Sequence, residues 1–414
     1  MLWEVFRYFD NGWITYYWVD TVFNFPLYGF DWVKPWPGDG MYFHFIAMGI
    51  LSVCIMVGFK YRISTILFFL AFSYVFVLDQ TTYLNHFYLI CLVSFVLIFV
   101  PAHKAFSIDS WRNKTLRTDF VPTWSLWLLR IQIGVPYFFG GIAKINEDWL
   151  NGNPLGTMLE SRADTFPILG EFFLETWFVY LFAYSALFLD LLAVPFLIWR
   201  RSRIYAYGLL VAFHVINSQL FEIGIFPWFM IFATLIFFDP SWPRIIKKFK
   251  TTKKSPPKIT SLTKNQKVII SLFLIFILFQ TVMPLRHHVY PGNVSWTEEG
   301  HNFSWHMKLR AKSTETIEFF ALSPKTGGAL EISPLDDLST RQIIIMSTRP
   351  DMILQYSHWL AENFRENGYD DIEITVDVFS SLNGRETQRL IDPDVNLANQ
   401  PVTILPKTWI VPLK

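Results

Sequence analysis

Charged residues are scarce in this sequence. Of its 414 residues, 17% are Asp, Glu, Lys or Arg, whereas soluble domains carry about 25%. Apolar residues make up 52% of the chain and aromatic residues 18%. The net charge is only +1, so the chain as a whole has no electrostatic attraction for nucleic acid, and we expect no nucleic acid among its partners.

Cysteine and the common catalytic motifs are also scarce or absent. The two cysteines, Cys54 and Cys91, both lie inside apolar runs, which excludes a disulfide framework in the polar part of the chain and argues against thiol chemistry. The sequence has no HExxH pair, no phosphate-binding glycine loop, no GxSxG turn and no dinucleotide fingerprint. We therefore predict no metal site.

Long apolar runs fill the first two thirds of the chain. A helix needs about 20 residues to cross the roughly 30 Å of hydrocarbon in a bilayer. We predict a polytopic α-helical membrane domain of about eight spans over residues 1–285, followed by a soluble α+β domain over residues 286–414. An aromatic, amphipathic stretch at 10–33 predicts an additional interfacial helix. The predicted spans are 41–59, 62–78, 84–100, 123–143, 173–199, 204–221, 223–239 and 267–284.

The soluble part contains further pattern signals. Residues 314–322 and 372–381 have the composition of strands. A helix is predicted around 338–367, with Ser339 or Thr340 as its N-cap.

Basic residues orient the predicted spans. Residues 244–267 carry nine Lys and Arg and no acidic residue, which is typical of a cytoplasmic loop. Alternation then places residues 101–122 and 200–203 on the same side. The loops 79–83 and 144–172, and everything after residue 285, fall on the outer side.

Four polar stretches meet at this predicted outer face, which suggests a single site there. They are "LDQTTYLNH" (78–86), "AKINEDW" (143–149), "FHVINSQLFEIG" (213–224) and "PLRHHVYPGNVSWTEEG" (284–300).

Lys144 is the first candidate residue of this site. It follows an apolar segment and has Gly140, Gly141 and Ala143 as neighbours. A lysine at a helix end can simply extend to the lipid headgroups. The small neighbours instead permit close helix packing that buries the lysine. Burial favours an uncharged amine, which can act as a base.

His86 and Asn85 begin the third predicted span. A histidine inside a membrane is costly unless it is paired, so His86 is a functional candidate, with structural packing as the alternative. Asp79 lies shortly before it and could orient it.

The sixth predicted span supplies His214, Asn217 and Gln219, followed by Glu222. A spacing of three places His214 and Asn217 on one helix face. Farther along, Trp305 and Met307 in "FSWHMKL" (303–309) could line an apolar ligand pocket or belong to an ordinary core. These residues alone leave open a quinone or lipid enzyme and a transporter.

At these same stretches the sequence resembles the vitamin K-dependent γ-glutamyl carboxylase family. The similarity lies in several separate motifs that occur in the same order. They are "YRISTILFFLAFSYVFVLDQTTYLNHFYL" (61–89), "LLRIQIGVPYFFGGIAKINEDWLNG" (128–152), "FHVINSQLFEIGIFPW" (213–228) and "VYPGNVSWTEEGHNFSWHM" (289–307).

The resemblance implies a lyase that is also an epoxidase. Vitamin K hydroquinone, O₂ and CO₂ would convert a glutamate of a peptide or protein substrate to γ-carboxyglutamate and form vitamin K epoxide. Lys144 would deprotonate the hydroquinone, and His86 would stabilise the glutamyl carbanion. The residues expected to bind substrate or quinone are Asn85, Asp79, His214, Asn217, Gln219, Trp305 and Met307.

The resemblance also implies a lipid bilayer and a lipid quinone as partners. The compact size and the lack of disulfides favour a bacterial inner membrane over an endoplasmic reticulum, with the site on the extracytoplasmic side. The sequence departs from the animal members at Ala143, where they usually carry a second lysine. Two alternatives therefore stay open: a quinone-oxygenating enzyme of the same fold without γ-carboxylation, and a non-enzymatic membrane binder or transporter.

Overall fold

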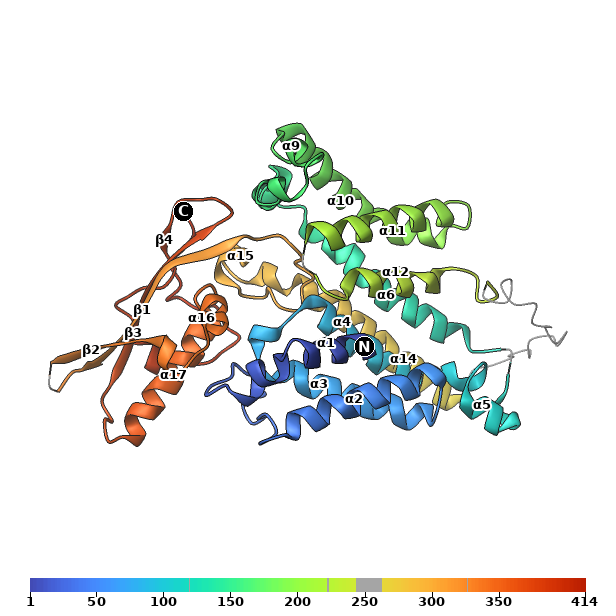
Figure 1. The fold of residues 1–414 in the computed structure, drawn as a ribbon, viewed down its shortest axis with the longest axis horizontal. Coiled ribbons are helices and arrows are strands. Elements are labelled where there is room, and N and C mark those ends of the chain that lie inside the picture. The colour runs from blue at the N-terminus through green and yellow to red at the C-terminus, as the bar shows by residue number, and fades with distance from the viewer. Residues whose placement is uncertain (119, 222, 243–262, 326) are drawn as a thin grey trace.

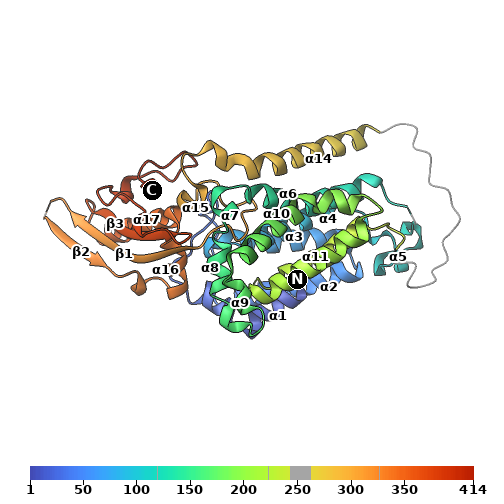
Figure 2. The same cartoon turned by 90° about the horizontal axis from the view of Figure 1, so that it is seen from above.

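A helical bundle carries a mixed α and β domain at one of its ends (Figure 1; Figure 2). The structure, a computed structural model, describes residues 1–118, 120–221, 223–242, 263–325 and 327–414. The helices of the bundle are α1 (Leu2–Asp10), α2 (Gly40–Val57), α3 (Tyr61–Leu78), α4 (Asn85–Phe99), α5 (Ile108–Arg112), α6 (Thr123–Ala143), α7 (Glu147–Leu150), α8 (Leu155–Glu160), α9 (Gly170–Phe173), α10 (Thr176–Ile198), α11 (Arg203–Leu220), α12 (Phe226–Thr234) and α14 (Lys264–Val282).

Among the described residues, five helical segments are long and apolar enough to cross a membrane. They are α2, α3, α6, α10 and the stretch Gln266–Val289, which contains α14. A sixth is possible if α4 and the segment Ala102–Arg112, bent by 53° against it, form one span. The outward faces of these helices expose large apolar side chains such as Phe188, Leu274 and Phe279, as expected for contact with lipid.

The predicted multi-pass class is confirmed, with five or six candidate spans among the described residues where about eight were predicted. Helices occupy all eight predicted segments, and five or six of them meet the criteria of length and composition. The segment at 204–221 became α11, whose second half carries four polar side chains between His214 and Gln219. The segment at 223–239 became α12, only nine residues long, with a 3-10 turn after it.

The predicted interfacial helix at 10–33 was wrong. Helix α1 ends at Asp10, and a π-helical turn, Thr15–Val19, is the last helical segment before α2. Three prolines in the intervening stretch lack the N–H group that a helix interior requires, which prevents a longer helix; they are Pro26, Pro35 and Pro37.

Helices α6 and α10 pack against each other through Gly141. A Cβ atom at this position would lie 2.8 Å from the Leu191 side chain and 2.9 Å from the Leu191 backbone nitrogen. No side chain larger than hydrogen therefore fits between the two helices at this point. The close approach brings the end of α6 next to the middle of α10.

The C-terminal domain contains a four-stranded antiparallel sheet with the order β2-β1-β3-β4. The strands are β1 (Lys312–Ser323), β2 (Gly328–Ile332), β3 (Glu373–Leu382) and β4 (Gln388–Arg389). Strand β3 alternates buried and half-buried residues, as a strand with one face on a core should. The strands predicted at 314–322 and 372–381 are confirmed.

Two helices, α16 (Thr340–Met346) and α17 (Pro350–Glu366), replace the single helix predicted over 338–367 (Figure 1). Ser339 is the N-cap of α16, because its hydroxyl accepts a hydrogen bond from the Gln342 backbone N–H. Pro350 begins the second helix, and residues that precede a proline disfavour helical conformation. Helix α17 buries Met352, Ile353 and Tyr356 against the sheet.

The two parts of the chain are tied together by shared contacts. Phe25, from the N-terminal region, is fully buried in the core of the C-terminal domain. Asp148, in α7 of the bundle, accepts hydrogen bonds from Arg385 (2.6 and 3.0 Å) and Asn383 (2.7 Å) of the C-terminal domain. The domain division at 285 and 286 stays a prediction.

Replacing Gly141 with alanine should destabilise the protein. The added methyl group must push α6 away from α10, and overpacking of this kind costs about 1–3 kcal/mol. Thermal unfolding of the purified protein measures the loss. Gly208→Ala, in α11, is the matched control, since its Cβ meets nothing within 4 Å. Equal melting temperatures for the two variants would contradict the proposed contact.

The ion pair between Asp148 and Arg385 predicts that the stability of the contact between the bundle and the C-terminal domain depends on pH. Burial of the Asp148 carboxyl would raise its pKa, but the hydrogen bonds from Arg385 and Asn383 outweigh burial and hold the pKa below its usual value. The stabilisation is therefore complete above the unfolded-state pKa of about 3.9 and is lost as the pH falls through the lower folded-state pKa. Asp148→Asn should lower the melting temperature at pH 7, and this difference should shrink as the pH is lowered below about 3.9. If the difference in melting temperature between Asp148→Asn and the wild type did not shrink at low pH, the ion pair would not be the source of the stabilisation.

Candidate active site

Lys144 ends α6 and is buried, at 4% exposure. Its ammonium nitrogen Nζ donates to Oδ2 of Asp190 at 2.7 Å and to the Gly140 carbonyl oxygen at 3.1 Å. The same nitrogen lies 5.3 Å from the centre of the Trp149 ring. The lysine therefore does not extend to the headgroups, and the small residues before it do permit its burial.

Asp190 is the residue that sequence reasoning missed. It is as buried as Lys144 and is the only charged residue in α10. An acidic residue inside an apolar span is a functional candidate by default, so the signal was present in the sequence.

The Lys144–Asp190 pair corrects the expectation that burial alone makes the amine neutral. Burial favours the uncharged amine, whereas a carboxylate in contact with it favours the charged ammonium. The pair can share one proton, which resides either on Nζ or on Oδ2. A neutral amine therefore requires that Asp190 hold this proton or that the pair lose it.

A cavity of about 450 Å³ lies beside this pair. Both charged residues line it, together with five of the other residues expected from the sequence: Asn85, His86, His214, Asn217 and Met307. Aromatic and aliphatic side chains complete much of the wall, among them Trp149, Leu155, Phe182, Phe213 and Phe226. Three of the four polar stretches therefore line one cavity, whereas the stretch 284–300 contributes no lining residue.

His86 and Asn85 lie at the start of α4 and have different surroundings. The His86 ring is buried and stacks on Phe226, with ring centres 5.5 Å apart. The Asn85 side-chain amide donates to the His306 carbonyl oxygen at 3.1 Å. Asn85 therefore connects the membrane helices to the segment that follows α15 (Val294–Thr297).

His214 is held by a hydrogen bond across the bundle. Its Nε2 lies 2.7 Å from the Tyr137 hydroxyl, which in turn lies 3.3 Å from the hydroxyl of Thr234. Its other ring nitrogen has no hydrogen-bond partner among the described residues. The ring is therefore anchored on one side and available on the other.

Three residues expected in the site do not line the cavity. Asp79 is buried but accepts from the Thr81 backbone N–H (2.7 Å) and the Asn24 amide (3.1 Å), so it fixes a loop. Gln219 is exposed on α11. Trp305 is buried in the core, where its ring packs 5.2 Å from that of Tyr88. Glu222 lies outside the described residues.

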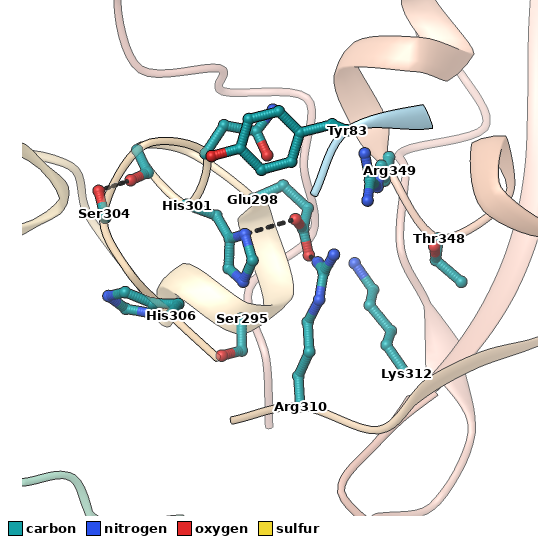
Figure 3. Close-up of polar contacts among 12 residues, drawn as sticks. Tyr83, Ser295, Glu298, His301, Ser304, His306, Arg310, Lys312, Thr348 and Arg349 are labelled. Carbon is teal, nitrogen blue, oxygen red and sulfur yellow. Dashed lines mark hydrogen bonds and ion pairs between the residues drawn. The ribbon is translucent and has the colours of Figure 1, made fainter. Parts of the chain in front are cut away.

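A cluster of buried charges supports the segment 298–311. Glu298 pairs with Arg310, and its Oε2 lies 3.7 Å from Nδ1 of His301. Figure 3 shows Arg310 and Lys312 extending toward this carboxylate, with Arg349 near it. Burial, followed by the charges of neighbouring arginines, lowers the pKa of Arg310 to about 9 and that of Lys312 well below its usual value.

This segment is also strained. Phe303, Trp305 and Lys308 have positive φ angles of 65°, 60° and 57°, a conformation that bulky residues rarely adopt. Such strain persists only where the surrounding contacts enforce it. The charge cluster and Asn85 supply such contacts, and they hold His306 and Met307 at the cavity wall.

Comparison with known families gives two matches that together cover most of the chain. Residues 1–242 match the HTTM domain. Residues 265–414 match the lumenal domain of vitamin K-dependent gamma-carboxylase. The chain belongs to the vitamin K-dependent gamma-carboxylase family. No solved structure matches it.

Membership of the carboxylase family confirms a multi-pass membrane protein with a lumenal-type C-terminal domain. The carboxylase lumenal domain begins near the start of α14, so the matched region includes both the last apolar helix and the segment that carries His306. Within the described residues, no group of three or more His, Cys, Asp and Glu side chains is placed to hold a metal ion.

Removing one member of the buried ion pair should cost more stability than removing both. Asp190→Leu leaves the ammonium of Lys144 unpaired, and an uncompensated buried charge costs about 3–5 kcal/mol. Lys144→Met combined with Asp190→Leu should recover most of this loss. A double-mutant cycle of thermal unfolding measures the coupling, and additive effects of the two substitutions would contradict a direct pair.

Proposed function

We propose that this protein is a vitamin K-dependent γ-glutamyl carboxylase and epoxidase. It would use vitamin K hydroquinone, O₂ and CO₂ to carboxylate glutamate in a peptide or protein. The main observation in support is the Lys144–Asp190 pair, which is buried between α6 and α10 and faces the same cavity as His86. Family membership supports the same reaction.

The cavity suits a lipid quinone. Ligand pockets typically enclose 300–1,000 Å³, with mostly apolar walls and a few placed polar groups, and this cavity has about 450 Å³. Trp149, Leu155 and Phe182 form an apolar wall next to Lys144. An aromatic quinone ring fits such a wall, and the bound hydroquinone would supply the ring that O₂ oxidises to the epoxide.

Lys144 would act as the base. Its uncharged Nζ would take the proton of a hydroquinone hydroxyl: the O–H bond breaks, an N–H bond forms, and the electron pair stays on oxygen. Asp190 would hold the pair's first proton throughout this step, which leaves Nζ uncharged and able to accept the second proton, and the Asp190 carbonyl oxygen would then accept a hydrogen bond from the ammonium. The closely packed helices around the pair keep out water that would compete for the proton.

Two arginines of the cavity suit a glutamyl side chain. Arg7 lines the cavity and is held by Glu4 at 3.0 Å, and Arg341 lines it beside Thr81. Guanidinium groups bind carboxylates well. His86, in the same cavity, would stabilise the carbanion that CO₂ then carboxylates. The further quinone and substrate contacts would come from Asn85, His214, Asn217 and Met307.

The orientation follows from charge and from the position of the C-terminal domain. Arg62 lies in the first turn of α3, whose far end leads to His86, and Arg203 begins α11, whose second half carries His214 of the cavity. Basic residues of this kind favour the cytoplasmic side. We therefore place the cavity and the C-terminal domain on the extracytoplasmic side, in a bacterial inner membrane.

One assay tests the proposed reaction and its alternatives. Purified protein in nanodiscs is given vitamin K hydroquinone, O₂, ¹⁴C-bicarbonate and a glutamyl peptide, and epoxide and fixed ¹⁴C are measured together. We expect both products from the wild type and a loss of at least about 100-fold in both for Lys144→Ala, as for removal of a general base.

Gln219→Ala is the matched control, since Gln219 lies outside the cavity, and it should retain both products. Epoxide without fixed ¹⁴C would point to the quinone-oxygenating alternative. Neither product from the wild type, or products unchanged in Lys144→Ala, would overturn the proposal and favour the binder or transporter.

A further inference from the structure

His306 has no assigned role, yet its side chain lacks the contacts that a structural histidine has. It is buried, at 7% exposure, and it lines the cavity. Neither of its two ring nitrogens has a hydrogen-bond partner among the described residues. Buried polar atoms are nearly always satisfied, and each exception requires an explanation.

The surroundings of His306 fix its ring without satisfying it. His287 packs edge-on against the ring, with centres 4.7 Å apart at an angle of 79°, and His301 lies 5.3 Å away. In Figure 3, His301 is directed toward Glu298, while the His306 ring lies apart from this charge cluster. The Asn85 amide holds the His306 backbone in place.

His306 lies at the Lys144 end of the cavity. A Cβ on Gly140 would be 2.9 Å from Cε of Met307, 3.7 Å from Oδ2 of Asp190 and 3.8 Å from the Trp305 carbonyl oxygen. The residues on both sides of His306 therefore contact the last turn of α6, immediately before Lys144. His306 and Lys144 line the same cavity, and the charge of Lys144 is among those that act on the His306 ring.

We propose that His306 donates a hydrogen bond to the hydroquinone oxygen that gives up its proton to Lys144. This inference rests on the proposed function and adds a catalytic residue to it. When the O–H bond breaks and Nζ gains the proton, the oxygen keeps the electron pair and becomes an anion. The His306 N–H, already oriented in a dry site, stabilises that anion without having to reorganise.

The charge state of His306 fits this role. Burial above all, and then the positive charges of His287, His288, Arg286 and Lys144, lower its pKa to about 3. The ring is therefore neutral at physiological pH, with one N–H donor and one acceptor nitrogen. A neutral donor can stabilise the anion without protonating it, so the oxygen keeps its reactivity.

The test compares His306→Leu with His306→Gln by two independent measurements. The first is the melting temperature of the ligand-free protein. Leucine removes two unsatisfied buried nitrogens, so we expect a rise of about 2–4 °C. The second is the kcat of epoxide formation, which should fall about 100-fold with leucine, as when an oxyanion donor is lost.

Glutamine retains an N–H donor and should restore kcat to within about tenfold of the wild type, with KM for the hydroquinone changing less than kcat in both variants. His301→Gln is the matched control, because His301 is buried next to His306 but does not line the cavity; it should lower the melting temperature and leave kcat nearly unchanged.

A melting temperature that falls in His306→Leu, an unchanged kcat, or no recovery with glutamine would each overturn the inference and make His306 a structural residue. Failure of the proposed function has a different signature, since the wild type itself would then form no epoxide.

Discussion

The arrangement of this protein depends on one ion pair in an apolar environment. Lys144 and Asp190 come from two different helices, and each alone would be a costly buried charge. Their contact requires that α6 and α10 approach closely, and Gly141 is the residue that allows it. The same contact fixes the amine at a cavity wall, so helix packing and the candidate chemistry share one constraint.

A second set of buried charges fixes the position of the segment 298–311, which lies outside the bundle. Glu298, Arg310, Lys312 and Arg349 hold a strained segment against the helix ends. That segment closes the cavity with His306 and Met307, which neither the bundle nor the sheet could place there. The C-terminal domain therefore contributes to the cavity itself, in addition to covering it.

The cavity combines groups that are rarely found together in an apolar interior. One cavity between aromatic side chains is lined by an amine paired with a carboxylate, by three histidines and by two arginines. A low dielectric strengthens every interaction among such groups and with a bound substrate. This setting suits chemistry in which a proton must be removed and water must be kept out, as the proposed carboxylase reaction requires.

The sequence determined the membrane class and the positions of two long strands, and six of the nine site residues proposed from it line the cavity, because apolar runs, alternation and short motifs are local properties. It counted eight spans where five or six described helices meet the criteria of length and composition, since periodicity cannot tell the polar α11 from a lipid-facing helix, and it overlooked Pro26 within 10–33. Tertiary structure decided the rest. Asp190 lies 46 positions from Lys144, Asp79 and Trp305 pack away from the cavity, and His306 faces it unpartnered. These outcomes depend on which helix faces meet, and that is set by packing over the whole bundle, not by any one segment.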